Sequence, residues 1–247
     1  DYLKDTGVDG IAVVSAIFAS DDCALATRKL FVKTRELFGK KRNIIMDMDG
    51  TLADSMPFWK KSAREYAILR GADIPDNFDE ITGVMDLNDY AEYVKNVLGI
   101  DTNLEQITEA AVEIMNKHYE KDIPAKDGMT ELVTREYEAG SRLVVFTASD
   151  RRSVEILLSH LGIRECFYDI YTVYDVGLKK SDKNSYLKVA ELAGMKDISQ
   201  VWVYEDILRG VKAAKEAGLN VCAVYDEDSA GDWEDIKELA DKTLELV

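Results

Sequence analysis

The chain has few cysteines and few prolines, and it has no surplus of basic residues. Its cysteines, Cys23, Cys166 and Cys222, form no CxxC pair, which argues against a disulfide framework and against a structural zinc site. This use of cysteine is typical of a reducing compartment, so we expect a cytoplasmic protein. Only 3 prolines occur, and no Gly/Ser-rich stretch divides the 247 residues into blocks. The composition therefore gives no sign of a flexible linker between tandem domains.

Acidic residues greatly outnumber basic ones, 47 against 31, so the formal net charge is −16. Such a charge repels nucleic acids and anionic membrane surfaces, and neither is an expected partner. The longest apolar run, Ile11 to Ala19, is interrupted by Ser15 and is far shorter than the ~20 residues that span a bilayer. Hydrophobic residues still make up 47% of the chain, which is enough for a substantial buried core.

Short apolar segments alternate with helical patterns over most of the chain. Strands are predicted at residues 43–47, 142–147, 169–174, 200–205 and 220–225. Helices are predicted at residues 129–139, 150–161, 182–194, 208–217 and 231–242. Alternation of this kind, with almost continuously apolar strands, is typical of a parallel sheet covered by helices on both faces. We therefore expect an α/β fold with a doubly wound parallel sheet.

Residues 54–123 break this alternation, because they show helical patterns alone. Helices are predicted there at residues 55–70, 77–83, 87–98 and 103–120. Since the block follows the first core strand, it is predicted to be an all-helical domain inserted into the α/β core. The core then comprises residues 41–53 and 124–247, and residues 1–40 form a separate strand–helix segment.

Polar residues stand where the predicted strands end. Asp47-Met48-Asp49-Gly50-Thr51-Leu52 follows the first core strand, and Phe146-Thr147-Ala148-Ser149 closes the second. Lys179-Lys180-Ser181-Asp182 lies after the third, and Tyr204-Glu205-Asp206 ends the fourth. Ligands of doubly wound sheets bind at the carboxyl ends of the strands, so these residues are expected to meet at one edge.

This set of residue types favours phosphoryl transfer to a carboxylate. Asp47 is the predicted nucleophile, which attacks phosphorus and forms an aspartyl-phosphate. Asp49 is the predicted general acid and base, which protonates the leaving oxygen and then deprotonates water. The phosphate-binding residues are predicted to be Gly50, Thr147, Ala148 and Lys180. Mg²⁺ prefers oxygen ligands, and its predicted ligands are Asp47, Asp49, Glu205 and Asp206.

These motifs resemble those of the haloacid dehalogenase-like hydrolase superfamily. The segment from Asp47 to Leu52 is similar to its first motif and Thr147 to its second, while Lys180 and Glu205-Asp206 are similar to its third and fourth. The resemblance covers about residues 42–226 and implies a Rossmann-like core with an α-helical cap. Two residues depart from the family pattern, Ser181 in place of a common proline and Ile207 in place of a common serine. Neither departure removes a catalytic group.

The resemblance also narrows the reaction class. Dehalogenases of the superfamily typically lack an acid at the position of Asp49, whereas its phosphatases and phosphomutases keep one. A Mg²⁺-dependent phosphatase of a small phosphorylated metabolite is therefore the leading prediction, as a monomer or a weak dimer. A phosphomutase of the β-phosphoglucomutase type is the first alternative. A non-catalytic regulatory module is an alternative from a different class.

Two features of the inserted block bear on the substrate. It contains fifteen acidic and seven basic residues, which is typical of a solvated acidic face. The same charge also suits a pocket that accepts cationic or neutral leaving groups rather than polyanions. Met56, Phe58 and Trp59 follow the first motif and either line the mouth of the pocket or pack between helices.

The segment from Gly7 to Phe18 resembles the last strand of thiamine-phosphate synthase, and the match covers about residues 1–36. Because the first methionine is Met46, we expect the chain to be cut from a longer polypeptide with such a domain fused upstream. This resemblance suggests thiamine phosphate, or a related intermediate, as the substrate. The alternative is a boundary remnant that says nothing about the substrate.

Overall fold

The structure is a computed structural model that describes residues 41–82, 85 and 87–245. The expected strand–helix segment at residues 1–40 lies outside the described residues. The residues that resemble thiamine-phosphate synthase belong to this segment. Throughout the described ranges, no helix combines the length and the apolar character that a membrane crossing requires.

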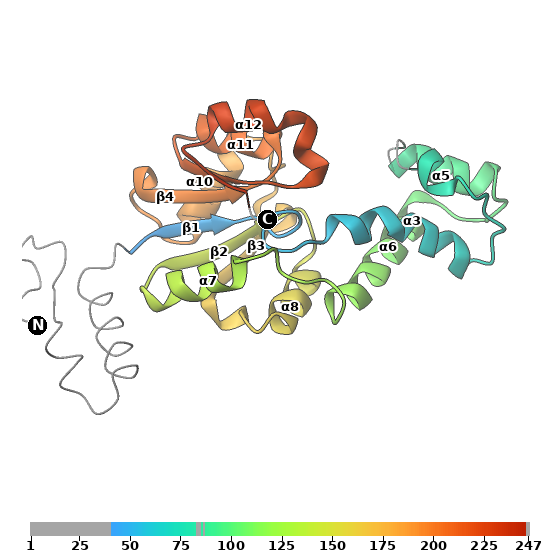
Figure 1. Ribbon diagram of the computed structural model, residues 1–247, viewed down its shortest axis with the longest axis horizontal. Helices are drawn as coiled ribbons and strands as arrows, with labels where there is room; N and C mark the ends of the chain where they lie inside the picture. Colours follow the sequence, from blue (N-terminus) through green and yellow to red (C-terminus); the bar gives the residue numbers. More distant parts are fainter. Residues whose placement is uncertain (1–40, 83–84, 86, 246–247) are drawn as a thin grey trace, which may run out of the picture.

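A six-stranded parallel sheet forms the centre of the molecule (Figure 1). Its strands are β1 (Asn43–Met46), β2 (Arg142–Thr147), β3 (Phe167–Thr172), β4 (Val201–Glu205), β5 (Asn220–Val224) and β6 (Lys242–Leu244). Their order across the sheet is β3-β2-β1-β4-β5-β6, and Ile45 of β1 lies beside Val144 and Val203. The strand order reverses at β1, and the crevices that bind ligands in α/β sheets open at such a point.

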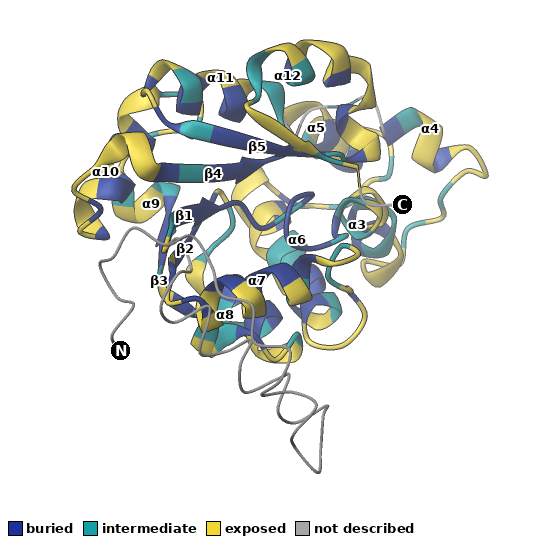
Figure 2. Cartoon of the chain, turned by 60° about the vertical axis from the view of Figure 1, so that its left-hand side comes forward, coloured by how far each residue is buried: buried dark blue, intermediate teal, exposed yellow. Residues whose placement is uncertain are grey.

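Helices cover both faces of this sheet (Figure 2). They are α7 (Met129–Glu138), α8 (Arg151–His160), α9 (Val173–Val176), α10 (Lys183–Leu192), α11 (Leu208–Glu216) and α12 (Trp233–Leu239). Successive side chains of a strand point to opposite faces. Ile44 accordingly belongs to an apolar cluster with Leu157 of α8, whereas Ile45 belongs to another with Val211 of α11. The predicted α/β fold with a doubly wound parallel sheet is confirmed.

Four further helices project from the carboxyl edge of the sheet, and we call them the cap (Figure 1). They are α3 (Met56–Leu69), α4 (Phe78–Thr82), α5 (Leu87–Asn96) and α6 (Leu104–Tyr119). Tyr66, Phe78 and Val94 are buried in an apolar cluster that belongs to the cap itself. The cap therefore has a hydrophobic core separate from the two cores of the sheet.

Two segments of chain run side by side between the cap and the sheet. The N–H of Asp54 donates to the carbonyl of Pro124 at 3.0 Å, and the N–H of Lys126 donates to the carbonyl of Leu52 at 2.9 Å. This paired connection places the cap directly above the residues that follow β1.

Several predicted boundaries differ from the structure by one to three residues, and two of the differences have a clear physical reason. The strand expected at residues 169–174 ends at Thr172, because the Thr172 side chain caps helix α9 by accepting from the N–H of Asp175. The helix expected at residues 231–242 ends at Leu239, since Lys242–Leu244 pair with β5 as an edge strand. Short 3₁₀ helices, which the sequence patterns did not indicate, precede β3, β4 and α12: η1 (Arg164–Cys166), η2 (Ile198–Gln200) and η3 (Glu227–Asp232).

Candidate active site

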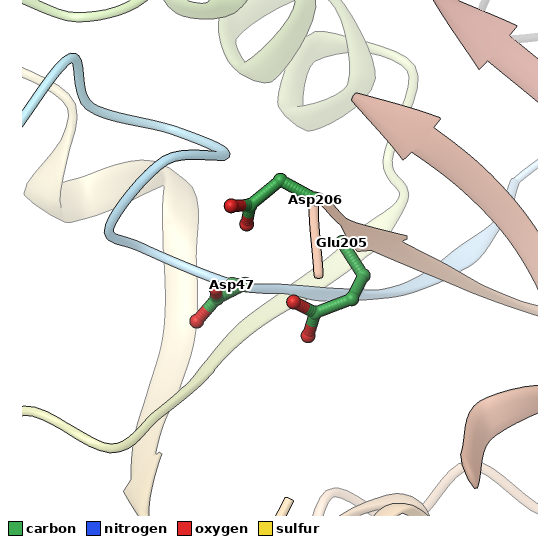
Figure 3. A group of neighbouring side chains, drawn as sticks. All are labelled: Asp47, Glu205 and Asp206. Atoms are coloured by element: carbon green, nitrogen blue, oxygen red, sulfur yellow. The ribbon is translucent and has the colours of Figure 1, made fainter. Parts of the chain in front are cut away.

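Three of the acidic residues predicted from the sequence, Asp47, Glu205 and Asp206, meet at the carboxyl edge of the sheet (Figure 3). Asp47 directly follows β1, and its N–H donates to the carbonyl of Tyr204 in β4 at 3.0 Å. Glu205 is the last residue of β4, and Asp206 follows it. Because β1 and β4 are paired neighbours, their ends bring these carboxylates together.

Lys180 lies between two of these acids. Its Nζ is 2.6 Å from Oδ1 of Asp47 and 2.6 Å from Oε2 of Glu205. The hydroxyl of Tyr186 in α10 donates to the same Glu205 oxygen at 2.9 Å. Lys180 comes from the loop between α9 and α10, so a third part of the chain supplies the cation of the site. The structure thus brings together the residues predicted as nucleophile, phosphate-binding lysine and metal-binding acid.

Burial sets the protonation behaviour of these groups. It raises the pKa of Asp47 to about 7, although the adjacent Lys180 cation opposes the shift. Burial also raises the pKa of Asp206 well above its ordinary value, and the Glu205 charge adds to that effect. For Lys180, burial alone lowers the pKa, but the carboxylates of Asp47 and Glu205 more than compensate and raise it. The lysine therefore remains a cation.

Asp47, Glu205 and Asp206 form a group that fits a divalent metal ion. One carboxylate oxygen from each lies within 4.8 Å of the others, and all three residues are buried. The hydroxyl of Thr51 donates to Oδ1 of Asp206 at 2.7 Å. Gly50 has φ of 81°, and a Cβ there would lie 2.3 Å from Oδ2 of Asp206. A glycine is thus required for the chain to pass close to the acid, and an all-oxygen donor set suits Mg²⁺.

The Asp49 carboxylate faces the cap and is not part of this acidic group. Its Oδ1 accepts from the hydroxyl of Ser55 at 2.7 Å and from Nε1 of Trp59 at 3.3 Å, and its Oδ2 accepts from the hydroxyl of Ser149 at 2.6 Å. The hydroxyl of Tyr119 also donates to Oδ1. Both carboxylate oxygens of Asp49 are thus engaged by these donors, and its predicted part in metal binding stays a prediction.

Sequence reasoning did not identify Tyr119 as a residue of the site. It is the last residue of α6, and its position in this amphipathic helix is typical of an ordinary core residue. Trp59 was expected near the pocket mouth or in helix packing, and the structure places its Nε1 against both Asp49 and the hydroxyl of Tyr119. Phe58 packs instead against the ring of His118, with the ring centroids 5.1 Å apart.

A pocket of about 480 Å³ opens in front of Asp47. Asp49, Thr147, Ala148, Lys180 and Glu205 line it, as does Met56 from the start of the cap. Its volume is within the range of pockets that bind small molecules. The two predicted catalytic residues and three of the four predicted phosphate-binding residues therefore line one cavity large enough for a small phosphorylated compound, whereas Gly50 does not line it.

Known proteins are similar to this chain in sequence and in fold. A family model described as haloacid dehalogenase-like hydrolase matches residues 44–224. The chain belongs to that family. The fructose-1-phosphate phosphatase YqaB of Escherichia coli is similar, with 26% identity over 196 residues, 76% of this chain and 98% of the relative. The phosphorylated carbohydrates phosphatase of Thermotoga maritima is 26% identical over 178 residues, 71% of this chain and 81% of the relative. Together they identify the chain as a phosphoric monoester hydrolase.

Solved structures of the family have the same fold. The structure of CbbY from Rhodobacter sphaeroides in complex with phosphate has a TM-score of 0.63 and 25% identity, and covers 83% of this chain and 93% of that chain. A putative β-phosphoglucomutase from Thermotoga maritima has a TM-score of 0.69 and 22% identity, and covers 83% of this chain and 94% of that chain. At that identity the second likeness shows the fold alone.

Proposed function

We propose that this protein is a Mg²⁺-dependent phosphatase that hydrolyses a small phosphorylated metabolite through an aspartyl-phosphate on Asp47. The observation that carries the proposal is the contact of Lys180 with both Asp47 and Glu205 in a pocket of metabolite size. The relatives named as phosphatases of phosphorylated carbohydrates support a small phosphate ester as the substrate.

The residues of the pocket divide the reaction between them. A carboxylate oxygen of Asp47 attacks phosphorus while the bond from phosphorus to the leaving oxygen breaks, and the phosphoryl group becomes attached to Asp47. Lys180 and Thr147 offer a cation and a hydroxyl to the phosphoryl oxygens, where negative charge increases in the transition state. The N–H of Ser149 donates to Oγ1 of Thr147 at 3.1 Å, which fixes that hydroxyl.

Asp49 is the proposed acid and base. In its protonated form it gives a proton to the leaving oxygen, and as a carboxylate it then takes a proton from the water that attacks the aspartyl-phosphate. In the structure Trp59 and Tyr119 of the cap donate hydrogen bonds to one carboxylate oxygen of Asp49, which lines the pocket, so the cap helps to position the proposed acid.

Mg²⁺ is the proposed metal, and Asp47, Glu205 and Asp206 are the residues that would hold it. When bound, such an ion neutralises charge on the phosphoryl oxygens and orients the ester. The remaining residues keep their roles: Thr51 holds Asp206, and Gly50 leaves room for its carboxylate.

Release of inorganic phosphate from a panel of phosphorylated metabolites, with Mg²⁺ or with a chelator, tests this function. The panel contains sugar phosphates, glycerol phosphate and thiamine phosphate. The expected result is phosphate release that requires Mg²⁺. Formation of an isomeric phosphate ester without phosphate release would show the phosphomutase alternative instead. No turnover of any ester, with ligand binding retained, would favour the non-catalytic alternative.

Thiamine phosphate is in the panel because of the resemblance at residues 1–36, which lie outside the described residues. Its use as substrate stays a prediction. It is supported if thiamine phosphate is hydrolysed faster than unrelated sugar phosphates, and it is abandoned if it is not.

A further inference from the structure

Two cationic side chains on the wall of the active-site pocket have no role in the proposed reaction. Lys179 and Arg209 line the same pocket as Asp47, and both are exposed. Within residues 41–82, 85 and 87–245, neither side chain makes an ion pair or a hydrogen bond. The neighbouring Lys180 is held by two carboxylates. In a chain with a net charge of −16, two cations without an acidic partner at the mouth of the active site require an explanation.

The backbones of both residues are fixed close to the catalytic acids. Lys179 immediately precedes Lys180, whose Nζ contacts Asp47. Arg209 lies in the first turn of α11 and immediately precedes Gly210, where a Cβ would lie 2.5 Å from Cδ of Glu205. Helices α10 and α11 pack against each other, so the loop that carries Lys179 and the start of α11 are adjacent. The two cations therefore border one cavity from neighbouring segments.

No acid of this pocket is left to neutralise them. Asp47 and Glu205 are in contact with Lys180, and the Asp49 carboxylate accepts its hydrogen bonds from the cap and from Ser149. Met56, which lines the pocket from the cap side, carries no charge. Lys179 also borders a shallower hollow beside acidic side chains, but it forms no ion pair with any of them in the described structure.

We propose that Lys179 and Arg209 form a subsite for a second anionic group of the substrate. The inference rests on the proposed function and makes it more specific: the preferred substrate is a small phosphate ester whose leaving part carries a further phosphate or a carboxylate. The planar guanidinium of arginine binds either oxyanion through two hydrogen bonds, and lysine adds a point charge. Two cations at this position repel a cationic leaving group. The acidic composition of the cap, considered alone, suits such a leaving group.

Matched esters and matched variants test the subsite. Phosphate release with Mg²⁺ is measured for a sugar monophosphate and the corresponding sugar bisphosphate, and for glycerol phosphate and phosphoglycerate. The proteins are the wild type, Lys179→Gln, Arg209→Gln and the double variant. Lys212→Gln is the control, because Lys212 is an exposed lysine on the same helix as Arg209 that does not line the pocket.

The wild type is expected to have a higher kcat/KM for at least one ester whose leaving part carries a further anionic group than for its matched partner, whose leaving part is uncharged. Because a hydrogen bond to a charged group is worth about 1.5–3 kcal/mol, the double variant is expected to lose about ten- to a hundredfold of that preference. Lys212→Gln is expected to retain it. The pair that shows the preference tells whether a phosphate or a carboxylate occupies the subsite.

Binding of the same esters to Asp47→Asn, measured by titration calorimetry, separates this inference from the proposed function. The subsite is supported if the ester with the second anionic group binds more tightly than its partner and if Lys179→Gln and Arg209→Gln abolish this difference. That result supports the subsite even if the wild type hydrolyses no ester. Equal binding of the matched esters overturns the subsite. An equal loss of kcat/KM for both members of a pair also overturns it, because the two cations would then act on the transferred phosphoryl group itself.

Discussion

The Asp49 carboxylate shows how single side chains from distant parts of the chain determine one catalytic group. Ser55 and Trp59 lie shortly after the first motif, Ser149 follows β2, and Tyr119 ends α6, yet all four donate hydrogen bonds to Asp49. Burial, together with the adjacent Asp49 charge, raises the pKa of Tyr119, so its hydroxyl stays a donor at neutral pH. The position of the proposed acid is therefore set in part by the cap.

Tyr119→Phe is predicted to lower kcat about tenfold with little change in KM, because a hydrogen bond to a charged group is worth about 1.5–3 kcal/mol and about 1.4 kcal/mol is tenfold in rate. Steady-state phosphate release with the best ester of the panel measures this. Tyr66→Phe is the matched control, since Tyr66 is buried in the cap and its hydroxyl contacts Thr102 instead. An equal effect of the two substitutions would contradict a positioning role for Tyr119.

Gly50→Ala is predicted to weaken Mg²⁺ activation as well as stability, because the added Cβ would displace the Asp206 carboxylate. Gly71→Ala is the control, since Gly71 also has a positive φ, 75°, but its Cβ would meet nothing within 4 Å. Backbone strain alone is expected to cost the control about 1–2 kcal/mol of unfolding free energy. Urea unfolding and Mg²⁺ titration of activity measure the two effects. Normal Mg²⁺ activation in Gly50→Ala would contradict the tight approach to Asp206.

The site residues at the ends of strands can be predicted from the sequence, because the carboxyl ends of parallel strands lie at the same edge of a sheet however the helices pack. Asp47, Thr147 and Glu205 were placed in this way, and the structure brings them to one pocket. Tyr119 was missed because its role depends on where α6 lies relative to β1. That placement follows from tertiary packing, and no local pattern of residues encodes it.

Helix α6 is the element that connects the cap to both the site and the core. Its N-terminus carries a capping box between Asn103 and Gln106, and its last residue reaches Asp49. Along its length Glu113 forms an ion pair with Arg152 of α8 at 2.6 Å, and Asn116 accepts from the hydroxyl of Ser153 at 2.7 Å. Any rotation of the cap must therefore break contacts between α6 and α8 as well as the contact to Asp49.

His118 fastens α6 to α3 in a pH-dependent way. Burial lowers its pKa, but hydrogen bonds to Asp122 at 2.9 Å and to Glu65 at 3.0 Å more than compensate and raise it. A raised folded-state pKa means that the contribution of protonated His118 to stability is fully present below the unfolded value of about 6.5. It is lost as the pH rises through the folded-state pKa.

His118→Asn is therefore predicted to destabilise the protein more at about pH 5.5, where the wild-type imidazole is protonated, than at about pH 8.5. Urea unfolding of wild type and variant at both pH values measures the difference. His160→Asn is the control, because His160 is exposed on α8 and forms no ion pair within the described residues. A loss of stability for His118→Asn that is the same at both pH values would contradict the ion-pair account.

At the scale of the whole molecule, the sequence predicts the fold class, but it does not predict the edge strand of the sheet or the paired connection to the cap. Buried β-branched strands such as β1 and β4 are recognisable because both of their faces are covered. The edge strand β6 is exposed at Lys242 and Thr243 and has only three residues, so it carries no apolar pattern and is not among the predicted strands. The paired connection to the cap also depends on contacts between residues about 70 positions apart, such as Asp54 with Pro124, which local patterns do not contain.

The central claim is that Asp47 receives the phosphoryl group, and comparison of phosphate release by the wild type and Asp47→Asn tests it most directly. Asp235→Asn, an exposed substitution on α12, controls for loss of one negative charge. The account predicts Mg²⁺-dependent release by the wild type and Asp235→Asn, and a loss of at least about a thousandfold in Asp47→Asn, since removal of a nucleophile eliminates the covalent route. Release by Asp47→Asn at the wild-type rate would contradict the assignment of Asp47 as nucleophile.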